Sequence, residues 1–350
     1  MKAITIANKK ISPNAPPFVI AEAGVNHNGR LDVAVRMVDA AARAGADAIK
    51  FQTFRAQDLA TKTAKMVAYQ KKNTGRSESQ LAMLKRLELK ESFYDPIMKR
   101  CKKRKIIFLS TPLGGFESID FLESLKVSAF KVASCDLDNT PVLGYIARLQ
   151  KPMLISTGMA NMGEIKQAIA CIKSQGNDKI IALHCTANYP CSLDEVNLAS
   201  MQTMMRELGV PVGYSDHTLG IQVSVMAATL GARVIEKHFT LDPNMQGPDH
   251  KASISPEELK ELVSAVKSVK TILGSSVKKP TKSEKAMSKD ARKSVVATQD
   301  IKKGELFTRD TIGMKRPGTG IRPQLYSKII GKQAKQNIPA DSLLKKRHYA

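Results

Sequence analysis

The sequence predicts an α/β fold, a TIM (β/α)8 barrel followed by a small β-rich domain. Eight short apolar runs, most of them rich in β-branched residues, recur along the chain and end in polar residues. They cover residues 18–24, 47–53, 106–112, 129–136, 152–158, 180–186, 210–218 and 233–240. Runs of this kind are typical of parallel strands that are covered on both faces. Because helix-like segments separate most of them, we predict eight βα units and a barrel, with a doubly wound open sheet as the alternative.

The helix-like segments carry the expected stop signals. Residues 30–45, RLDVAVRMVDAAARAG, and residues 161–176, NMGEIKQAIACIKSQG, both end in glycine at the expected C-cap. The second unit is overlong, with about fifty residues between Thr53 and Ile106, and it includes the polar stretch KKNTGRSESQ at 71–80. Such an insertion at the mouth of a barrel is either a lid over the substrate or a decorative surface loop.

The composition changes after residue 276. Residues 277–293, VKKPTKSEKAMSKDARK, are rich in Lys and Ser and indicate a linker. Beyond them lie short β-like segments and turn signals, such as SVVATQDIKKGELFT at 294–308. We therefore predict a catalytic barrel over residues 1–276, a linker over 277–293 and a small β-rich domain over 294–350.

The composition also narrows the class of protein. Hydrophobic residues make up 43% of the 350 residues, which is ample for a core. The five cysteines form no CxxC pair, so we expect a reduced, cytoplasmic protein without a disulfide framework or a cysteine zinc site. No apolar run reaches 18 residues, and the first ten residues lack the apolar stretch of a signal peptide. We expect no association with a membrane.

The net charge of +23 raises nucleic acid as a partner. The basic residues are interspersed with apolar ones, however, and form no long blocks. Aromatic residues make up only 5% of the chain, and Trp is absent. We therefore expect no nucleic-acid partner, and we interpret the charge as a solvated basic surface together with sites for anionic small molecules.

Charged and polar residues end nearly every predicted strand. In a TIM barrel the catalytic residues gather at these carboxyl ends. The residues delivered there are Glu22, Lys50, Gln52, Ser110, Thr111, Lys131, Ser134, Ser156, Thr157, His184, Ser215, Asp216, His217, Glu236 and His238. Each alone has an ordinary explanation, such as an ion pair or a helix N-cap. A merely structural barrel would not need charge at nearly every strand end, so together they predict an active site.

The chemistry of these residues divides into three groups. His217 and His238, on adjacent strands, are suited to holding one divalent metal with positions open to water and substrate; two hydrogen-bonded histidines are the alternative. A cationic group rich in hydrogen-bond donors suits a phosphate, and it consists of Lys50, Lys131, Thr111, Ser134, Ser156 and Ser215. The acidic group suits sugar hydroxyls, metal-bound water or proton transfer, and it consists of Glu22, Glu236 and Asp249.

Nine motifs in register resemble those of sialic acid synthases. They are FVIAEAGVNHNG, IKFQTF, FKVAS, ISTGM, LHCTANYP, GYSDHT, IEKHFTLD, GPDHKAS and KRPGTGI. The resemblance spans nearly the whole chain, including a tail that is similar to type III antifreeze proteins and so to the SAF, or β-clip, domain. It implies an enzyme that joins phosphoenolpyruvate to an open-chain N-acylated amino sugar. The products would be phosphate and a nine-carbon 2-keto acid.

The resemblance also implies roles for single residues. His217 and His238 would bind the catalytic metal, usually manganese or magnesium. Phosphoenolpyruvate would be held by Lys50, Thr111, Lys131, Ser134, Ser156 and Ser215. The sugar and its metal-bound waters would be faced by Glu22, Gln52, Tyr189 and Asp249. The residues closest to the chemistry would be Glu22, Lys50, Lys131 and Glu236. Arg316 would reach from the tail into a partner's barrel in a domain-swapped homodimer and contact the N-acyl group.

Departures from the resemblance bear on the choice of sugar. Ala187 stands where bacterial members that use N-acetylmannosamine often have Asn, and Asp136 stands where many members have Glu. Residues 73–79 do not clearly reproduce a sugar-contacting Asn, although Asn73 is close. The stretch KMVAYQKKN at 65–73 resembles members that use a 2,4-diacetamido-trideoxy sugar and make legionaminic acid. Three products therefore remain open: N-acetylneuraminate, N,N'-diacetyllegionaminate and pseudaminate.

Two other functions compete with this interpretation. A metal-independent Schiff-base aldolase would use the amine of Lys50 or Lys131 as a nucleophile. A basic nucleic-acid or ice-binding protein would explain the charge and the tail, but it would leave the polar strand ends without a purpose.

Overall fold

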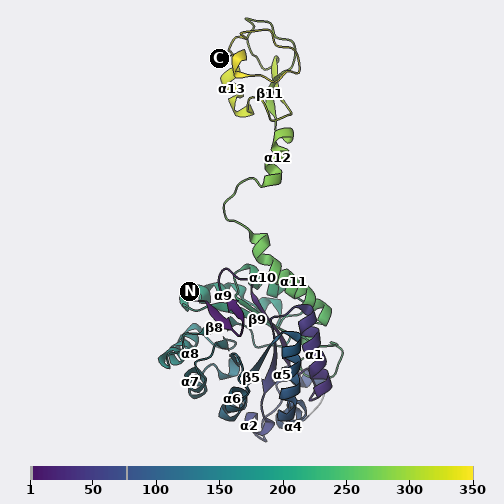
Figure 1. Ribbon diagram of the computed structural model, residues 1–350, viewed down its shortest axis with the longest axis vertical. Helices are drawn as coiled ribbons and strands as arrows, with labels where there is room; N and C mark the ends of the chain where they lie inside the picture. The colour runs from purple at the N-terminus through teal and green to yellow at the C-terminus, as the bar shows by residue number, and fades with distance from the viewer. Residues whose placement is uncertain (1–2, 76–77, 350) are drawn as a thin grey trace. The chain divides into compact units, whose positions relative to one another are not determined.

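The computed structural model describes residues 3–75 and 78–349. Arg76 and Ser77, which belong to the predicted polar stretch of the second βα unit, lie outside the described residues, as do residues 1–2 and Ala350. The chain forms two compact units, Met1–Gly274 and Ser275–Ala350 (Figure 1). Each unit has its own apolar core.

Eight parallel strands form one sheet in the first unit. They are β3 (Phe18–Gly24), β4 (Ala48–Thr53), β5 (Ile107–Pro112), β6 (Phe130–Val132), β7 (Met153–Ser156), β8 (Ile180–His184), β9 (Val212–Asp216) and β10 (Val234–His238). Each predicted apolar run contains one of them. The order across the sheet is β5-β4-β3-β10-β9-β8-β7-β6, and its two outer strands, β5 and β6, are in contact. In addition, β3, the first of these strands in the sequence, pairs with β10, the last. The sheet therefore closes on itself, so the TIM barrel is confirmed and the open doubly wound sheet is wrong.

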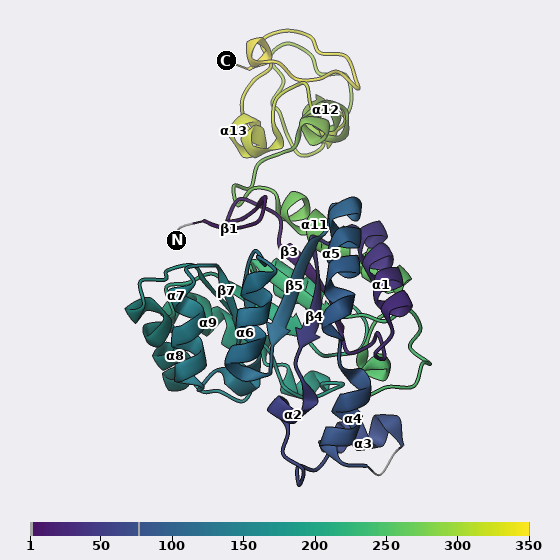
Figure 2. The same ribbon diagram turned by 60° about the horizontal axis from the view of Figure 1, so that its bottom comes forward.

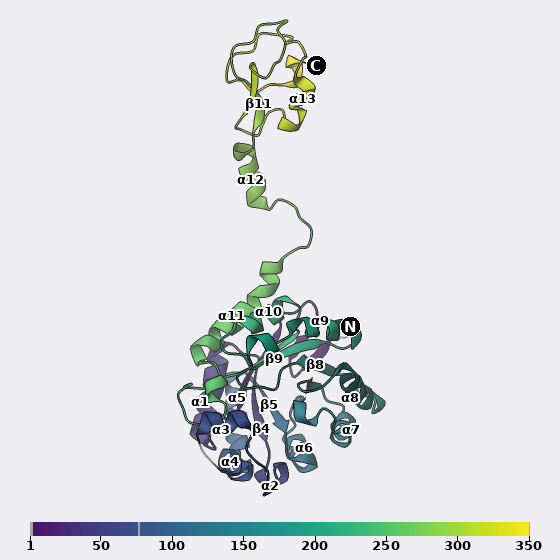
Figure 3. The ribbon, with the colours of Figure 1, turned by 180° about the vertical axis from the view of Figure 1, so that it is seen from behind.

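Helices surround the barrel (Figures 2 and 3). They are α1 (Leu31–Ala44), α5 (Tyr94–Arg104), α6 (Gly115–Ser124), α7 (Thr140–Arg148), α8 (Met162–Ser174), α9 (Leu198–Glu207), α10 (Gln222–Thr229) and α11 (Pro256–Leu273). The predicted stop of α1 is confirmed, because Gly45 adopts a left-handed φ of 82° that costs glycine little. Short 3-10 turns occur at η2 (Ser134–Asp136), η3 (Leu193–Glu195) and η4 (His250–Ala252).

The long insertion in the second βα unit of the barrel is folded. Between β4 and β5 it contains α2 (Ala56–Leu59), α3 (Ala68–Thr74), α4 (Gln80–Leu87) and η1 (Glu91–Phe93), followed by α5. Its apolar side chains form a cluster of their own with Val25, and this cluster comprises Val25, Phe54, Ala56, Met83, Leu84 and Leu87. Helices α2, α3 and α4 group together at one end of the barrel (Figure 2). The insertion is therefore a packed subdomain at the barrel end.

An N-terminal hairpin closes the opposite end. Strands β1 (Ile4–Ile6) and β2 (Lys9–Ile11) pair antiparallel. Their isoleucines pack against inward-facing residues of the barrel strands, among them Ile20 and Leu109. The sequence did not predict this hairpin. It covers the bottom of the barrel, opposite the carboxyl ends of the strands.

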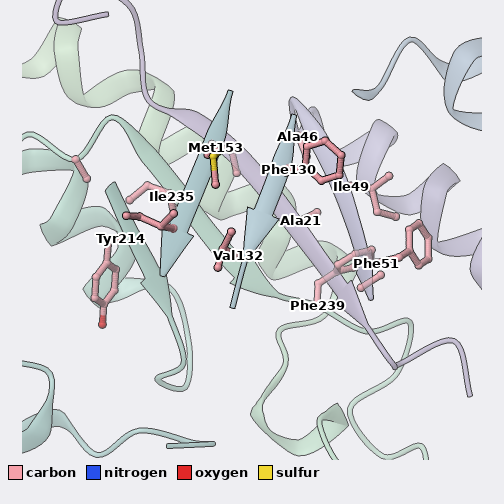
Figure 4. Close-up of a cluster of buried hydrophobic side chains, with 14 of the residues drawn as sticks. Ala21, Ala46, Ile49, Phe51, Phe130, Val132, Met153, Tyr214, Ile235 and Phe239 are labelled. Atoms are coloured by element: carbon pink, nitrogen blue, oxygen red, sulfur yellow. The ribbon is translucent and has the colours of Figure 1, made fainter. Parts of the chain in front are cut away.

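Side chains alternate between the inside and the outside of the barrel along each strand. Ala21, Ile49, Phe51 and Ile235 belong to the apolar cluster between strands and helices (Figure 4). Their neighbours Glu22, Lys50 and Glu236 line the interior cavity. This period of two separates the three consecutive charged residues of β10, because Glu236 and His238 face inward while Lys237 lies between them.

Lys237 forms a fully buried ion pair with Asp216 on the neighbouring strand. Its Nζ lies 2.9 Å from Asp216 Oδ2 and donates to the Thr218 carbonyl at 2.6 Å. Hydroxyls of Thr218 and Ser224 also donate to the carboxylate of Asp216. All polar atoms of the pair are thus satisfied away from the cavity. Asp216 has a structural role, although the sequence places it among the charged strand ends.

Replacing Lys237 by Met should therefore lower the free energy of unfolding by about 3–5 kcal/mol, because it leaves the Asp216 charge buried without its partner. The double variant Lys237→Met with Asp216→Asn should cost clearly less, since it removes both charges. Denaturant unfolding followed by circular dichroism measures both values. Equal losses in the single and double variants would contradict the assignment of a buried ion pair.

The second unit is smaller and only partly β-structured. Its elements are α12 (Lys282–Ala291), β11 (Ser294–Ala297), β12 (Ile312–Lys315), η5 (Pro323–Leu325), α13 (Tyr326–Ile329) and η6 (Lys346–His348). Strands β11 and β12 pair antiparallel, and isolated bridges such as Ile301–Ile338 add further β contacts. Helix α12 lies within the predicted linker and begins at a capping box of Thr281 and Glu284. No helix in the described part of the chain has the length and apolar character needed to span a membrane.

Candidate active site

One interior cavity of about 170 Å³ lies at the carboxyl ends of the barrel strands. It is lined by every residue to which the resemblance assigns a role, except Asp249 and Arg316. These residues are Glu22, Lys50, Gln52, Thr111, Lys131, Ser134, Ser156, Tyr189, Ser215, His217, Glu236 and His238. Leu113, Ala133, Cys135, Met159 and Ala187 complete the wall. Strands that are far apart in the sequence therefore deliver the predicted residues to one place.

Two lysines and two glutamates alternate around the cavity floor. Lys50 Nζ lies 2.9 Å from Glu22 Oε2 and 3.8 Å from Glu236 Oε1. Lys131 Nζ lies 3.6 Å from the same Glu236 oxygen. All four side chains are almost fully buried. Charges at this depth interact strongly, because little water screens them.

The surroundings shift the pKa values of the two carboxyl groups in opposite directions. Burial raises the pKa of Glu22 to about 7, although Lys50 acts against it. Burial also disfavours ionisation of Glu236, but Lys131 and Lys50 outweigh it and lower the pKa of that group. Near neutral pH, Glu22 is therefore able to hold or release a proton, whereas Glu236 is an anion.

The pKa values of the two lysines are also shifted in opposite directions. Burial alone would lower the pKa of Lys50, but Glu22 and Glu236 outweigh burial and raise it. Burial lowers the pKa of Lys131, which has Glu236 as its main counter-charge. Lys50 is thus a fixed cation, and Lys131 is the amine that depends more on an anionic ligand for its charge.

Hydroxyl groups complete a ring of donors around the lysines. Lys50 donates to Thr111 Oγ1 at 3.0 Å, and Lys131 donates to Ser156 Oγ at 2.7 Å. Ser134 Oγ accepts from the backbone N–H of Gly158 at 3.0 Å. A Cβ at position 158 would lie 2.8 Å from that oxygen, so the close approach requires glycine. The ring can bind a small anion through several charge-assisted hydrogen bonds.

The two histidines at the ends of β9 and β10 face each other, with ring centroids 5.6 Å apart. His217 Nδ1 lies 2.6 Å from the Thr186 carbonyl and donates to it, which leaves Nε2 without a proton. His238 Nδ1 is buried without a partner. Burial lowers the pKa of both rings, to about 4 for His217, so both are neutral at neutral pH.

These features fit a divalent metal. A metal-binding imidazole is neutral and has its other nitrogen held by a backbone carbonyl or carboxylate, as His217 has. In residues 3–75 and 78–349 no group of three or more His, Cys, Asp or Glu side chains is placed to hold a metal. A metal at the pair would therefore take its remaining ligands from water and substrate, which is the open coordination that catalysis uses.

An aromatic wall covers the histidines on the side of the insertion. The ring of Tyr189 lies 4.1 Å from His217 and 5.5 Å from His238, between centroids. The ring of Tyr69, from α3, lies 5.0 Å from Tyr189. Asp249 lies beside Tyr69 and outside the cavity lining. The sequence singled out the stretch around Tyr69 but not this residue, because only the fold brings it to Tyr189.

Four other residues that the sequence assigns to the site do not line the cavity. His184 bonds to the Val196 carbonyl at 2.9 Å and does not line the cavity. Thr157 donates to the Leu183 carbonyl, and Ser110 bonds to Thr53. These three strand ends thus have ordinary structural partners. Arg316 lies in the second unit with an exposed side chain, so its predicted contact with a partner's barrel stays a prediction.

Comparison with known proteins agrees with the geometry. The model of the NeuB family matches residues 37–278, and that of the SAF domain matches residues 292–350. The chain belongs to the NeuB family. The N,N'-diacetyllegionaminic acid synthase of Campylobacter jejuni is 46% identical to this NeuB-family chain over 330 residues, covering 94% of the chain and 98% of the relative. The synthase of the same name from Legionella pneumophila is 44% identical over 354 residues, covering 98% and 99%.

A solved structure supports the same assignment. The N-acetylneuraminic acid synthetase of Leptospira borgpetersenii superimposes with a TM-score of 0.72 at 34% identity, covering 82% of this chain and 95% of that chain. The resemblance to sialic acid synthases and the SAF tail predicted from the motifs are both confirmed.

Proposed function

We propose that this NeuB-family protein condenses phosphoenolpyruvate with an open-chain N-acylated amino sugar and water to give a nonulosonic acid and phosphate. The observation that carries the proposal is the cavity, in which a ring of lysines and hydroxyls adjoins a neutral histidine pair. We further propose 2,4-diacetamido-2,4,6-trideoxymannose as the sugar, because both relatives described above are N,N'-diacetyllegionaminic acid synthases. N-acetylmannosamine, which would give N-acetylneuraminate, is the alternative sugar, and pseudaminate is the less favoured alternative product.

In this proposal the ring of donors binds phosphoenolpyruvate. Lys50 and Lys131 hold its phosphate and carboxylate by charge-assisted hydrogen bonds, together with the hydroxyls of Thr111, Ser134, Ser156 and Ser215. The same lysines stabilise the charge that develops on the departing phosphate. Because the cavity is buried, these interactions act with little screening by water.

The reaction forms one C–C bond and breaks one C–O bond. C3 of phosphoenolpyruvate attacks the aldehyde carbon of the sugar, and the aldehyde oxygen takes up a proton. Water adds at C2 and gives up one proton, which leaves a hydroxyl there. The bond from C2 to the phosphate oxygen then breaks, and the proton of that hydroxyl passes to the departing phosphate to leave the keto acid. Glu22, which lies beside Lys50 in the cavity, is the group placed to exchange these protons. A divalent metal held by His217 and His238, manganese or magnesium, would supply a Lewis acid for the aldehyde oxygen.

Phosphate release tests the proposed reaction. Purified protein with phosphoenolpyruvate and manganese should release phosphate only when the amino sugar is also present, and treatment with a chelator should stop the release until metal is returned. A Schiff-base aldolase, the alternative that uses a lysine, would act without metal and would be inactivated by borohydride in the presence of its keto acid. Sugar-independent or metal-independent release would contradict the proposal.

We also propose a domain-swapped homodimer in which Arg316 completes the partner's site. If His217→Ala and Arg316→Ala are each inactive, a mixed dimer of the two contains one intact site. With half of the dimers mixed, activity should recover to about a quarter of the wild-type value, as two-fold pairing requires. Recovery is measured by phosphate release after subunit exchange has been confirmed independently. No recovery would mean that Arg316 acts within its own chain.

A further inference from the structure

The aromatic wall connects the insertion directly with the histidine pair. The ring of Tyr69 lies 5.0 Å from that of Tyr189 at an interplanar angle of 30°, and the ring of Tyr189 lies 4.1 Å from that of His217 at an angle of 36°. No residue of the short helix α3, which carries Tyr69, is fully buried, and Gln70 Nε2 donates to the Tyr69 hydroxyl at 3.3 Å. Through Tyr69, α3 contacts the aromatic ring that covers the histidine pair.

Helix α3 is also fastened to the loop that precedes η4. Asn73 Nδ2 donates to the Pro248 carbonyl at 2.7 Å. Burial raises the pKa of the Tyr69 phenol, and the Asp249 carboxylate next along that loop, which accepts a hydrogen bond from that phenol, raises it further. Oδ1 of Asp249 is buried and has no hydrogen-bond partner. Tyr69 and the Asp249 carboxylate therefore lie side by side, and one carboxylate oxygen has no partner.

The size of the cavity limits which substrate it can hold. About 170 Å³ is less than the roughly 300–1,000 Å³ of pockets that bury a drug-sized ligand. The ring of cationic donors occupies this inner space, which suits the smaller, phosphate-bearing substrate. The cavity therefore has no room for a whole open-chain amino sugar in addition to phosphoenolpyruvate. Tyr189 lines the cavity, and Tyr69 and Asp249 lie next to it, outside the cavity lining.

We propose that Tyr69 is a specificity-determining residue, which forms an apolar wall against the far end of the amino sugar, next to Asp249, which the resemblance already assigns to the sugar. The inference rests on the proposed function. An aromatic face contacts methyl and C–H groups favourably but gives no hydrogen bond to replace the one that a hydroxyl makes with water. Tyr69 thus favours sugars that carry a methyl group at the far end over sugars with a primary hydroxyl there.

Steady-state kinetics of Tyr69→Ala and Tyr69→Phe test this inference. The two sugars are 2,4-diacetamido-2,4,6-trideoxymannose and N-acetylmannosamine, each with saturating phosphoenolpyruvate. Tyr69→Ala should raise the KM for the diacetamido sugar by at least about tenfold and reduce the preference in kcat/KM by a similar factor. The KM for phosphoenolpyruvate should change by less than about twofold, since the donor ring is untouched. Tyr69→Phe, which keeps the ring, should retain most of the preference.

Tyr145→Ala is the matched control. Tyr145 also contacts an aromatic ring, that of Phe116, edge to face at 5.1 Å, and it donates to Asp120, but it lies on α7 outside the cavity lining. This variant should keep the wild-type preference.

An unchanged preference in Tyr69→Ala, or equal effects on phosphoenolpyruvate and sugar, would overturn the inference while leaving the proposed function standing. If the wild-type protein converts neither sugar with phosphoenolpyruvate, the proposed function fails and the inference fails with it.

Discussion

Replacing either His217 or His238 by Ala should reduce turnover by at least about a thousandfold, or ~4 kcal/mol of activation free energy, and leave the fold intact. The reason is that each change removes one of only two protein ligands from the proposed metal site, so the remaining ring cannot hold the ion. Phosphate release measures the rate, elemental analysis measures bound manganese, and circular dichroism reports on the fold.

His184→Ala provides the control for these variants. His184 also follows a barrel strand, but its ring bonds to the Val196 carbonyl and does not line the cavity. This variant should keep its metal and most of its rate. Near-normal rate and metal content in either His217→Ala or His238→Ala would show that the metal assignment is wrong.

Replacing Lys131 by Ala should raise the KM for phosphoenolpyruvate far more than that for the sugar. The loss should be about 2–3 kcal/mol, the usual effect of removing a charge-assisted contact. Lys131 belongs to the donor ring through its bond to Ser156, whereas the proposed sugar contacts lie toward Tyr189. Initial rates with each substrate varied in turn separate the two KM values.

Lys151→Ala is a suitable comparison, because Lys151 pairs with Glu123 outside the cavity lining. It should leave both KM values near those of the wild type. Equal increases for the two substrates in Lys131→Ala would contradict the proposed division of the site into a phosphate side and a sugar side.

The sequence predicts the strands well because each apolar run is buried on both faces. The runs overestimate strand length at the carboxyl ends, as in β6, which ends at Val132 although the run continues to residue 136. There the chain turns into the 3-10 helix η2, which takes Ser134 out of the ladder and into the cavity wall. Ser134 thus reaches the cavity from outside the ladder, whereas Lys50, Lys131 and Glu236 reach it from within their strands.

The direction of side chains was only partly accessible from the sequence. The period of two along β10 separates Lys237 from Glu236 and His238, but a partner for Lys237 appears only when β9 lies beside it. Asp216 for the same reason looks like a site residue in the sequence and is a structural one in the fold.

Contacts between distant segments were not accessible at all. The position of Tyr69 against Tyr189 depends on how the insertion folds over the barrel, and no local pattern encodes that. The same holds for Asn73. The sequence places it near a sugar-contacting position, but in the fold its Nδ2 donates to the Pro248 carbonyl.

The proposed condensation is tested most directly by mass spectrometry of the products. The phosphoenolpyruvate carries ¹⁸O as the oxygen that bridges C2 and phosphorus. With the diacetamido sugar and manganese, the product should have the mass of a diacetamido nine-carbon 2-keto acid, and the released phosphate should contain the label, because the C–O bond breaks. If no nine-carbon 2-keto acid forms with either candidate sugar, or if the label remains in the organic product, the proposed reaction is wrong.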